Sequence, residues 1–315
     1  MILLTGAAGY IGSHLSYQFK INKIPFIGID NFSAGNNFNM IHPKIKKIDI
    51  GEKKKILYLI KKYNIKHVIH AAAFSYPVES ELKSNKYRIN NYLKTKKFVD
   101  SFKKKGLESF IFLSSSNVYS EKSELSYKET DKVRPKNVYG KYKYLIERYL
   151  IKKKNIKKVI ILRLFNVVGF IKNFKFNLHS SKNQRLISIV IRSMKSNKPV
   201  YLNYYKLKKQ LISPKRDFIE IKDLTKIILK ILKNLNKFDN YGIFNIGSGK
   251  KISLETIINK IKKFGKKKLV IKKKLIDPKE LNVTWCSKKK IEKKISIKLN
   301  INIDKVIKSS LRNIN

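Results

Sequence analysis

The sequence predicts an α/β fold in which a doubly wound parallel sheet is covered by helices on both faces and followed by a smaller C-terminal domain. Three observations lead to this prediction. Short apolar runs alternate with amphipathic stretches through the first half of the 315-residue chain, a glycine-rich turn follows the first run, and the alternation stops after Gly169. Strands buried on both faces are continuously apolar, and right-handed crossovers place helices on both faces, so the arrangement is of the Rossmann type.

The first half contains six expected strands, each a short apolar run: Met1–Thr5, Ile24–Asp30, Ile45–Ile50, His67–Ala72, Ser109–Ser115 and Val159–Leu164. The helices expected with them are amphipathic: Ile11–Phe19, a stretch ending near Tyr63, Glu79–Lys105 and Asn137–Lys154. Strands that alternate with helices in this way predict one nucleotide-binding domain over residues 1–169, to which residues 216–247 return.

The second half follows a different pattern. Residues 170–182 are polar and loop-like, and helices are expected over Leu186–Lys195, Asp217–Asn234 and Ser253–Phe264. Ser253 is a suitable N-cap for the last of these helices, and Gly265 is well placed to end it. A strand is expected to end in a turn at residues 244–249. We therefore expect residues 170–215 and 248–315 to form a substrate-binding domain.

The chain carries 72 lysine and arginine residues against 21 acidic ones, a net charge of +51. Such a charge is typical of proteins that bind nucleic acid or another polyanion. Only eight of the basic residues are arginine, which specific nucleic-acid readers use for bidentate contacts. Lysine is abundant together with isoleucine and asparagine along the whole chain, as an A/T-rich genome would encode. We interpret the charge as compositional and keep an RNA-binding protein on a dehydrogenase scaffold as an alternative.

The single cysteine, Cys286, excludes an intramolecular disulfide and a cysteine cluster for zinc, and it fits the reducing cytoplasm. The apolar run Met1–Leu4 is too short for a signal peptide, and no window approaches the 18 apolar residues of a membrane span. These features predict a soluble, cytoplasmic protein. His14, His67 and His70 have no surrounding ligand cluster, so we expect them to pack in the core and expect no metal site.

The turn after the first strand reads Gly6-x-x-Gly9-x-x-Gly12 and leads into a helix. Its glycines permit a tight turn, close approach of a pyrophosphate and packing of the helix on the strand, and the helix N-terminus favours phosphate charge. Asp30 ends the second strand, where a carboxylate binds the adenosine ribose and repels a 2′-phosphate. The pattern therefore predicts NAD rather than NADP, against the alternative of a purely structural turn. The residues predicted to hold NAD in this region are Gly6, Gly9, Tyr10, Ile11, Gly12, Asp30, Asn31, Asp49 and Ile50.

Tyr139 and Lys143 are four residues apart on an expected helix, so both side chains lie on one face. A phenol has a pKa of about 10, but an adjacent ammonium and a positively charged nicotinamide both favour the phenolate. Tyr139 can then take a proton from a sugar hydroxyl while the same carbon is oxidised. Ser115 ends a serine-rich strand earlier in the chain, and its hydroxyl can bridge the substrate oxygen and the tyrosine. This position, rather than the tyrosine–lysine spacing alone, makes the pair a candidate catalytic site.

These segments together resemble the extended short-chain dehydrogenase/reductase family, and within it most closely the NAD-dependent nucleotide-sugar 4-epimerases. The resemblance covers most of the chain, most strongly up to Gly169, in these segments: 5–15, 30–31, 68–72, 90–91, 114–119, 139–143, 163–169 and 216–224. It implies that three residues are catalytic: Ser115, Tyr139 and Lys143. It implies that further residues contact the cofactor: Ala71, Ala72, Asn91, Tyr139, Lys143 and Phe165. The residues implied to bind a nucleotide sugar are Ser115, Tyr139, Asn166 and Arg216, the last through the diphosphate.

The residues after Ser115 discriminate between reactions. Dehydratases similar to this chain carry a carboxylate just after the catalytic hydroxyl, and decarboxylases usually do so too, whereas the chain has Ser116 and Asn117. Neither side chain acts as an acid or base at pH 7, which favours epimerisation at C4 of a UDP-glucose or UDP-galactose type sugar through a 4-keto intermediate. The alternatives within the family are an epimerase of UDP-N-acetylhexosamines and a reductase.

The chain departs from the epimerase pattern near its C-terminus. The family has an arginine followed three residues later by an acid, which clamp the nucleotide, but alignment on Trp285 places Asp277 and Glu280 there. Lys274 or Lys279 is a candidate replacement for the missing arginine.

Other departures bear on the sugar and on assembly. Thr284 stands where the family often has a tyrosine, so the site has room for an N-acetyl group, and Arg185 replaces a neutral residue. Trp285 is expected to pack, with lining of the sugar pocket as the alternative. The resemblance also implies a homodimer, which the helices expected over Glu79–Lys105 and Asn137–Lys154 would form.

Overall fold

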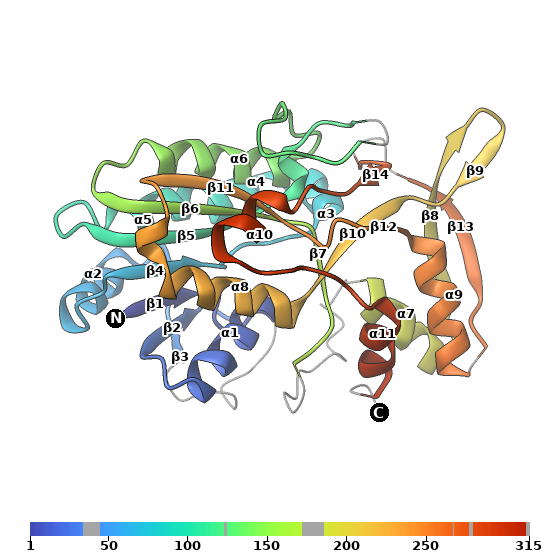
Figure 1. Ribbon diagram of the computed structural model, residues 1–315, viewed down its shortest axis with the longest axis horizontal. Helices are drawn as coiled ribbons and strands as arrows, with labels where there is room; N and C mark the ends of the chain where they lie inside the picture. Colours follow the sequence, from blue (N-terminus) through green and yellow to red (C-terminus); the bar gives the residue numbers. More distant parts are fainter. Residues whose placement is uncertain (34–44, 123–124, 172–185, 267, 277–279, 313–315) are drawn as a thin grey trace.

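The computed structural model of the protein describes residues 1–33, 45–122, 125–171, 186–266, 268–276 and 280–312. Its largest feature is a sheet of seven parallel strands in the order β11-β6-β5-β4-β1-β2-β3 (Figure 1). These strands are β1 (Ile2–Thr5), β2 (Phe26–Asp30), β3 (Ile45–Lys47), β4 (His67–His70), β5 (Leu107–Ser115), β6 (Ile156–Leu164) and β11 (Tyr241–Ile246). The predicted α/β fold class with a doubly wound parallel sheet is confirmed.

Helices cover the two faces of this sheet and form two separate hydrophobic cores. Leu3 packs in the core on the side of α2 (Lys53–Lys62), α5 (Thr95–Asp100) and α6 (Val138–Ile151), whereas the adjacent Leu4 packs on the opposite side. The opposite core is covered by α1 (Tyr10–Ile21), α8 (Ile221–Lys233) and, beside β11, α10 (Lys289–Ile295) (Figure 1). Because both faces are buried, the central strands contain runs of consecutive apolar residues, such as Ile2–Leu4 in β1, and burying each such side chain stabilises the fold by about 1.5–3 kcal/mol.

The long helix expected over Glu79–Lys105 is interrupted in the structure. It consists of α3 (Pro77–Leu82), α4 (Ser84–Tyr87), a π-helical turn over Arg88–Lys94, and α5. Lys83 leaves the helical conformation between α3 and α4. The extra residue of a π turn displaces a side chain from its usual helical position. Here the turn contains the buried Asn91, whose amide bonds to a neighbouring loop.

The helix expected from Asp217 begins only at Ile221, because the preceding residues form β10 (Lys215–Glu220). β10 pairs with three short strands of a second sheet: β7 (Asn166–Val168), β12 (Lys251–Ser253) and β14 (Val283–Thr284). The apolar periodicity after Glu220 does form a helix, α8. The buried Asp217 instead needs hydrogen-bond donors, and an extended backbone brings the donors to it. Strand geometry also sends neighbouring Arg216 and Asp217 to opposite faces.

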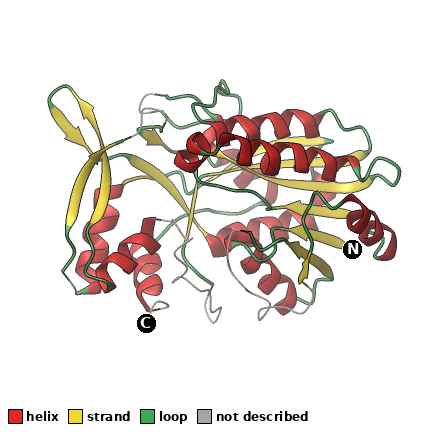
Figure 2. Ribbon diagram, turned by 180° about the vertical axis from the view of Figure 1, so that it is seen from behind, coloured by secondary structure: helices red, strands yellow, loops and turns green. Residues whose placement is uncertain are grey.

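A third sheet of order β13-β8-β9 projects beside the main sheet, with three helices packed near it (Figures 1 and 2). Its members are β8 (Val200–Leu207), β9 (Gln210–Ile212) and β13 (Ile271–Leu275), and the helices are α7 (Leu186–Lys195), α9 (Leu254–Gly265) and α11 (Ile303–Arg312). The remaining elements are short 3₁₀ turns at Ser116–Val118 and Leu235–Lys237. The division into domains at residues 169, 215 and 247 stays a prediction, and most of the expected loop 170–182 lies outside the described residues.

The ends of α9 show one prediction confirmed and one wrong. Ser253 caps the helix by accepting a hydrogen bond from the Thr256 N–H at 3.0 Å. Gly265 does not form the C-cap, because Lys266 takes the left-handed conformation with φ of 52°. A Cβ on Gly265 would lie 2.3 Å from the Cε of Met194, so the glycine makes room for α7 instead. No helix among the described residues is long and apolar enough to cross a membrane.

Candidate active site

A cavity of about 610 Å³ lies at the carboxyl ends of the central strands and extends to β8 and β10. Parallel sheets place ligand sites at this edge. Thirteen of the residues predicted to form the site line it: Gly6, Gly9, Tyr10, Ile11, Gly12, Asp30, Ala71, Ser115, Tyr139, Lys143, Phe165, Asn166 and Arg216. The fold therefore brings together residues that span more than 200 positions of the sequence.

The glycine turn is built so tightly that side chains do not fit. A Cβ on Gly12 would lie 1.9 Å from the carbonyl oxygen of Gly6, and a Cβ on Gly6, whose φ is +67°, would lie 2.6 Å from the Ala72 nitrogen. Gly9 precedes the first residue of α1, so the first amides of that helix face the cavity edge. This cradle of backbone fits the pyrophosphate of a dinucleotide.

Asp30 lies at the end of β2 with its carboxylate held by backbone amides. Oδ2 accepts a hydrogen bond from the Ala8 N–H at 2.9 Å, and Oδ1 accepts one from the Phe32 N–H at 2.7 Å. Burial raises the pKa of Asp30, although these backbone N–H groups oppose the shift. Asp30 also lines the cavity, where a carboxylate can accept a further hydrogen bond, such as one from a ribose hydroxyl.

A second hollow, of about 480 Å³, contains Asp49. Its Oδ2 accepts hydrogen bonds from Asn31 Nδ2 at 2.6 Å and from the Lys94 ammonium at 2.8 Å. Burial alone would raise the pKa of Asp49, but the hydrogen bonds from Lys94, Gly51 and Asn31 lower it overall. Asn31, Asp49 and the buried Ile50 do not line the main cavity, so their contact with a cofactor stays a prediction.

The candidate catalytic residues come from β5 and α6. Ser115 ends β5, and the Lys143 ammonium donates to the Leu113 carbonyl at 2.7 Å and lies 5.9 Å from the centre of the Tyr139 ring. Burial lowers the pKa of Lys143 to about 7, and Glu147 one turn later opposes this shift. The buried Lys143 is therefore close to its charge transition near neutral pH.

Side chains fix the first turn of α6, which carries Tyr139. The Val138 N–H donates to Glu81 Oε1 at 2.7 Å, and the Tyr139 N–H donates to Ser80 Oγ at 3.1 Å. Both acceptors belong to α3. They satisfy amides that a helix start leaves unpaired, and they hold the tyrosine backbone relative to α3.

A buried ion pair lies next to the candidate catalytic residues. The guanidinium of Arg163 on β6 binds Glu147 of α6, with Nη2 at 2.7 Å from Oε2, and both side chains are almost fully buried. Ser114, next to Ser115, also donates to Glu147, and Arg163 Nη1 donates to the Tyr119 hydroxyl. This network ties the end of β5 to α6.

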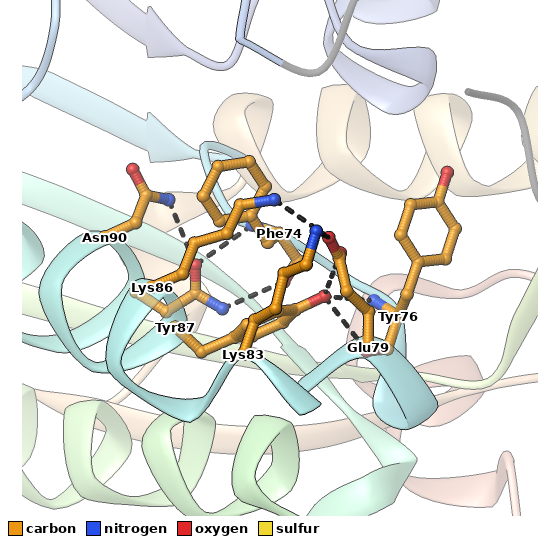
Figure 3. Close-up of polar contacts among 8 residues, drawn as sticks. Phe74, Tyr76, Glu79, Lys83, Lys86, Tyr87 and Asn90 are labelled. Carbon is orange, nitrogen blue, oxygen red and sulfur yellow. Dashed lines mark hydrogen bonds and ion pairs between the residues drawn. The ribbon is translucent and has the colours of Figure 1, made fainter. Parts of the chain in front are cut away.

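The loop between β4 and α3 forms one wall of the cavity, and the sequence analysis did not predict it. Phe74, Ser75, Tyr76 and Pro77 all line the cavity. Asn91 accepts from the Phe74 N–H at 3.0 Å and donates to its carbonyl at 2.8 Å (Figure 3). The predicted cofactor contact of Asn91 stays a prediction, since Asn91 does not line the cavity and supports Phe74 instead.

A cluster of polar side chains from α3 and α4 supports the same loop (Figure 3). The Lys86 ammonium donates to Glu79 Oε1 at 2.9 Å and lies 4.2 Å from the centre of the Phe74 ring. The Tyr87 hydroxyl accepts from the Tyr76 N–H at 3.2 Å and lies 2.9 Å from Glu79 Oε2. Lys83 also pairs with Glu79, at 3.8 Å from the same oxygen, so the cluster holds two ammonium groups around one carboxylate.

The far end of the cavity is formed by side chains from the second and third sheets. Arg216 Nη1 donates to the Asn282 carbonyl at 2.9 Å, and Nη2 lies 3.8 Å from Glu280 Oε2. Asn166 donates to the backbone carbonyl of Asp217 at 2.8 Å. Asn203 Nδ2 contacts Glu280 Oε1 at 3.4 Å. A diphosphate-sized anion at this end would meet a guanidinium that is already oriented by backbone.

Asp217 holds this end together. Its carboxylate accepts hydrogen bonds from the Ser248 amide and hydroxyl, the Gly249 amide, and the amide and thiol of Cys286. Burial raises the pKa of Asp217, and these donors oppose the shift. The single cysteine is thus buried in a structural contact, and the turn after β11 is joined to β10.

The structure shows where several of the residues lie that depart from the family pattern near the C-terminus. Glu280 and Thr284 line the cavity, Trp285 does not, and Lys274 is exposed on β13. Asp277, Lys279 and Arg185 lie outside the described residues. Further lining residues that the sequence analysis missed are Leu186, Ile187, Ser188, Ile189, Tyr201, Leu202 and Asn203. These residues belong to α7, which was expected from the sequence, and to β8, which was not. Nothing in the local sequence indicates which of their side chains face a cavity.

The histidines make internal contacts. His70 lies between the hydroxyls of Thr5 at 2.8 Å and Thr95 at 3.2 Å, and burial followed by the charge of Lys143 lowers the pKa of His70 to about 3. His67 contacts Ser109 at 3.0 Å. Within the described residues, no three histidine, cysteine or acidic side chains form a group able to hold a metal ion.

The charge of the cavity contrasts with that of the whole chain. Among the described residues that line it, the cations are Lys143 and Arg216 and the acids are Asp30 and Glu280. The balance is neutral, although the chain carries +51. Within the described part of the chain, the excess of lysine therefore lies outside the lining of this cavity.

The fold and the site define a dinucleotide-binding α/β enzyme with a serine, a tyrosine and a lysine at one cavity. The chain belongs to the NAD dependent epimerase/dehydratase family, whose model matches residues 2–247. The predicted family is confirmed, and so is the prediction that NAD is the cofactor.

Named relatives cover most of the chain. A dTDP-4-dehydro-6-deoxyglucose reductase of Escherichia coli is 29% identical over 278 residues, which are 86% of this chain and 83% of the relative. A UDP-glucose 4-epimerase of Halalkalibacterium halodurans is 27% identical over 262 residues, 82% and 78% of the two chains. The solved structure of a Thermus thermophilus UDP-glucose 4-epimerase in complex with NAD has a TM-score of 0.87 at 21% identity and covers 99% of this chain and 98% of that one. This structural likeness establishes a shared fold.

Proposed function

We propose that the protein epimerises a nucleotide sugar of the UDP-glucose or UDP-galactose type at C4, through a transient 4-keto sugar, with NAD as resident cofactor. The observation that carries the proposal is the shared cavity: Ser115, Tyr139 and Lys143 line the same space as the glycine cradle. The residues after Ser115 are Ser116 and Asn117 rather than the carboxylate that an elimination needs. The names of the two relatives support a nucleotide-sugar substrate.

The described residues fit a bound NAD. Gly6, Gly9 and Gly12 line the cavity without side chains, which suits a pyrophosphate, and Asp30 lines it with a carboxylate that can accept from the adenosine ribose. The hydrogen-bonded pair of Asn31 and Asp49 would meet the adenine. When bound, NAD supplies the electron acceptor and then the donor for C4 of the sugar.

The protein's own groups manage the proton. Tyr139 as phenolate accepts the proton of the 4-hydroxyl and later returns it, while Ser115 hydrogen-bonds to the same oxygen. The Lys143 ammonium favours the phenolate by its charge and is held in place by the Leu113 carbonyl. Inversion requires the 4-keto sugar to present its other face before the proton returns, so the hexose must turn inside the cavity.

The nucleotide must stay bound while the hexose turns. Arg216 lines the cavity, and its guanidinium is held by the Asn282 carbonyl. A guanidinium binds a diphosphate well, which makes Arg216 our candidate to take over from the clamping arginine that the chain lacks. Lys274 is exposed on the third sheet, which makes it the weaker candidate for this role.

The test is conversion of UDP-galactose, UDP-glucose and their N-acetyl forms by purified protein without added NAD, followed by chromatography. We expect at least one pair to interconvert. If none does, even with NAD supplied, the proposed epimerisation is wrong. Tyr139→Phe should lower kcat by about 10²- to 10⁴-fold and leave NAD bound. The matched control is Tyr142→Phe on the same helix. The ring of Tyr142 stacks on Tyr92, and this variant should keep the native kcat.

Two related activities are the alternatives. Thr284 lines the cavity and leaves space for an N-acetyl group, which favours UDP-N-acetylhexosamines among the substrates. The Escherichia coli relative is a reductase, which favours reduction of a 4-keto nucleotide sugar. A reductase consumes one reduced cofactor per product, whereas an epimerase turns over many times on the cofactor that it carries. Counting NADH consumed per product formed separates the two.

We also propose that two copies associate through α3–α5 and α6. Val78 and Leu82 lie four residues apart on α3 and are 49% and 80% exposed. Apolar side chains on one helix face at this exposure indicate a contact surface. Sedimentation velocity should give a dimer for the native chain and a monomer for Leu82→Glu. The exposed Leu125 serves for the control substitution Leu125→Glu, which should leave the dimer intact.

A further inference from the structure

The Ser115 hydroxyl receives two hydrogen bonds from one neighbour. The backbone N–H of Asn117 donates to Ser115 Oγ at 3.2 Å, and Nδ2 of the same residue donates to it at 3.2 Å. A hydroxyl has two lone pairs and one hydrogen. Both lone pairs are therefore occupied by Asn117, and the hydrogen remains for a partner in the cavity, which Ser115 lines.

The orientation of the Asn117 amide is set from the backbone of α6. The Gly140 N–H can only donate, and it donates to Asn137 Oδ1 at 2.8 Å. Asn137 Nδ2 therefore faces Asn117 and donates to its Oδ1 at 3.0 Å. This leaves Asn117 Nδ2 to donate to Ser115 Oγ. Every hydrogen bond from the Gly140 N–H of α6 to the Ser115 hydroxyl therefore has its donor on the side of α6.

Packing keeps this chain in place. Asn137 and Ser115 are both buried. Rotating the side-chain amide of Asn137 by 180° would turn its Nδ2 toward the Gly140 N–H, and rotating that of Asn117 would turn its Nδ2 toward Asn137 Nδ2, so in each case a donor would face a donor. Such a mismatch costs about 1–3 kcal/mol. A Cβ on Gly140 would lie 2.1 Å from the Asn117 carbonyl oxygen, so the glycine lets α6 rest directly on the turn at Ser116–Val118.

We propose that Asn117 is a positioning residue that fixes the Ser115 hydroxyl as a hydrogen-bond donor toward the reacting oxygen of the substrate. The inference rests on the proposed function, because it assigns the direction of one hydrogen bond in that reaction. A fixed donor suits an oxygen that carries negative or carbonyl character, as O4 does during oxidation and in the 4-keto sugar. The role of base is thereby left to Tyr139 alone.

An aspartate at the same position would reverse this polarity. A carboxylate has no hydrogen to donate, so Ser115 would turn its hydrogen to the new side chain and present lone pairs to the substrate. Asn117→Asp should lower kcat about 10²- to 10³-fold at pH 8 with KM changed less than threefold, because the loss of one aligned donor costs about this factor in rate. The protonated acid can donate again, so the ratio of variant to native kcat should rise as pH falls.

The pH profile separates positioning from structural damage. The other titratable or charged side chains that line the cavity in the described part of the chain are Tyr10, Asp30, Tyr76, Tyr139, Lys143, Tyr201, Arg216 and Glu280. They are common to both proteins, so the ratio of the two profiles reports the new carboxyl. The control Asn240→Asp adds the same charge at an exposed position before β11 and should give a flat ratio. A flat ratio for Asn117→Asp as well would overturn the proposal.

A second substitution tests the chain itself. Asn137→Asp still accepts from the Gly140 N–H but cannot donate to Asn117, whose amide would turn over and present oxygen to Ser115. We expect its kcat to fall as far as that of Asn117→Asp, with no further loss in the double variant. Additive losses would contradict a shared path.

Neutron diffraction from the deuterated native protein, without substrate, shows directly which groups donate in the hydrogen bonds between Asn117 and Ser115. We expect deuterium on Asn117 Nδ2 facing Ser115 Oγ, and the Ser115 deuterium directed into the cavity. If the Asn117 oxygen faces Ser115, the inference is wrong whatever the protein converts. If the native protein converts no nucleotide sugar but shows the expected deuterium positions, the proposed function fails and the polarity of Ser115 stands.

Discussion

The two ends of the cavity are built in different ways. The end of the cavity predicted to hold NAD is formed mainly by the turn from Gly6 to Gly12, where the fit depends on backbone, with the Asp30 carboxylate beside it. The substrate end is assembled from segments far apart in the chain, and its contacts are side chains such as Asn203, Arg216 and Glu280. A backbone cradle has little freedom to change, whereas a set of side chains can be exchanged one at a time. We expect the first end to tolerate substitution poorly and the second to adjust its specificity.

The largest expected effect is at the cofactor end. Gly12→Ala forces a Cβ to within 1.9 Å of the Gly6 carbonyl oxygen, and neither backbone atom can yield without moving α1 from β1. NAD affinity should fall at least 100-fold in calorimetry, with a loss of about 3 kcal/mol in unfolding free energy. In the comparison variant Gly9→Ala the added Cβ lies 3.3 Å from the same oxygen, so the loss in unfolding free energy should be far smaller. Equal losses in the two variants would break the contrast between the two positions.

The next effect is at the substrate end. Arg216→Met removes the one cation that faces this end among the described lining residues. KM for the nucleotide sugar should rise about 30- to 100-fold, because truncating a hydrogen-bonded charge costs 2–5 kcal/mol. NAD affinity should stay unchanged, and Arg148→Met, at an exposed position of α6, should alter neither value. A parallel loss of NAD binding would show that the two ends are not separable.

Lys143 lies between the two ends, and its pKa predicts a dependence of stability on pH. Burial lowers the pKa to about 7, whereas an unfolded lysine has a pKa of about 10.4. Between these values the unfolded chain binds one more proton than the folded chain. The free energy of unfolding of the native protein, relative to Lys143→Met, should therefore rise by at most about 1.4 kcal/mol per pH unit from pH 7 to 10.

Urea unfolding at pH 7, 8 and 9 measures this difference. Below pH 7 both states are protonated and the difference should be constant. Lys141→Met, an exposed neighbour on α6, provides the control and should run parallel to the native protein. Parallel curves for Lys143→Met would mean that Lys143 is not desolvated as the structure indicates.

The smallest effect concerns the choice of cofactor. Asp30→Asn removes the negative charge and keeps one oxygen, which can accept from the Ala8 amide or from the Phe32 amide but not from both. The preference for NAD over NADP should fall about tenfold, or ~1.4 kcal/mol, measured as the ratio of the two dissociation constants. Asp239→Asn at an exposed position should leave the ratio unchanged. An unchanged ratio in Asp30→Asn would place the discrimination elsewhere.

The cofactor end was largely predictable from the sequence because its physics is local. The spacing of Gly6, Gly9 and Gly12 follows from one turn and one helix start, and Tyr139 and Lys143 share a face by helical periodicity alone. Parallel strands end at a common edge, which brings Ser115 to the same cavity. The roles assigned to these residues stay predictions until the variants are measured.

The substrate end was not predictable in the same way, because it depends on tertiary pairing. The extended conformation at Asp217 follows from donors at Ser248 and Cys286, which no local window contains. The wall at Phe74 depends on an amide at Asn91 within a π turn, where periodicity indicated a regular helix. Lining by Asn203 depends on which face of β8 is turned to the cavity.

The contacts of Asp217 also set an order of events during synthesis. The carboxylate leaves the ribosome about seventy residues before its last donors, the amide and thiol of Cys286. The strands from β1 to β6 can pair before that moment, while Asp217 still depends on water. In a nascent chain the nucleotide cradle is therefore complete well before the last donors to Asp217, and we expect sugar binding to begin only after the segment that contains Cys286 has folded back.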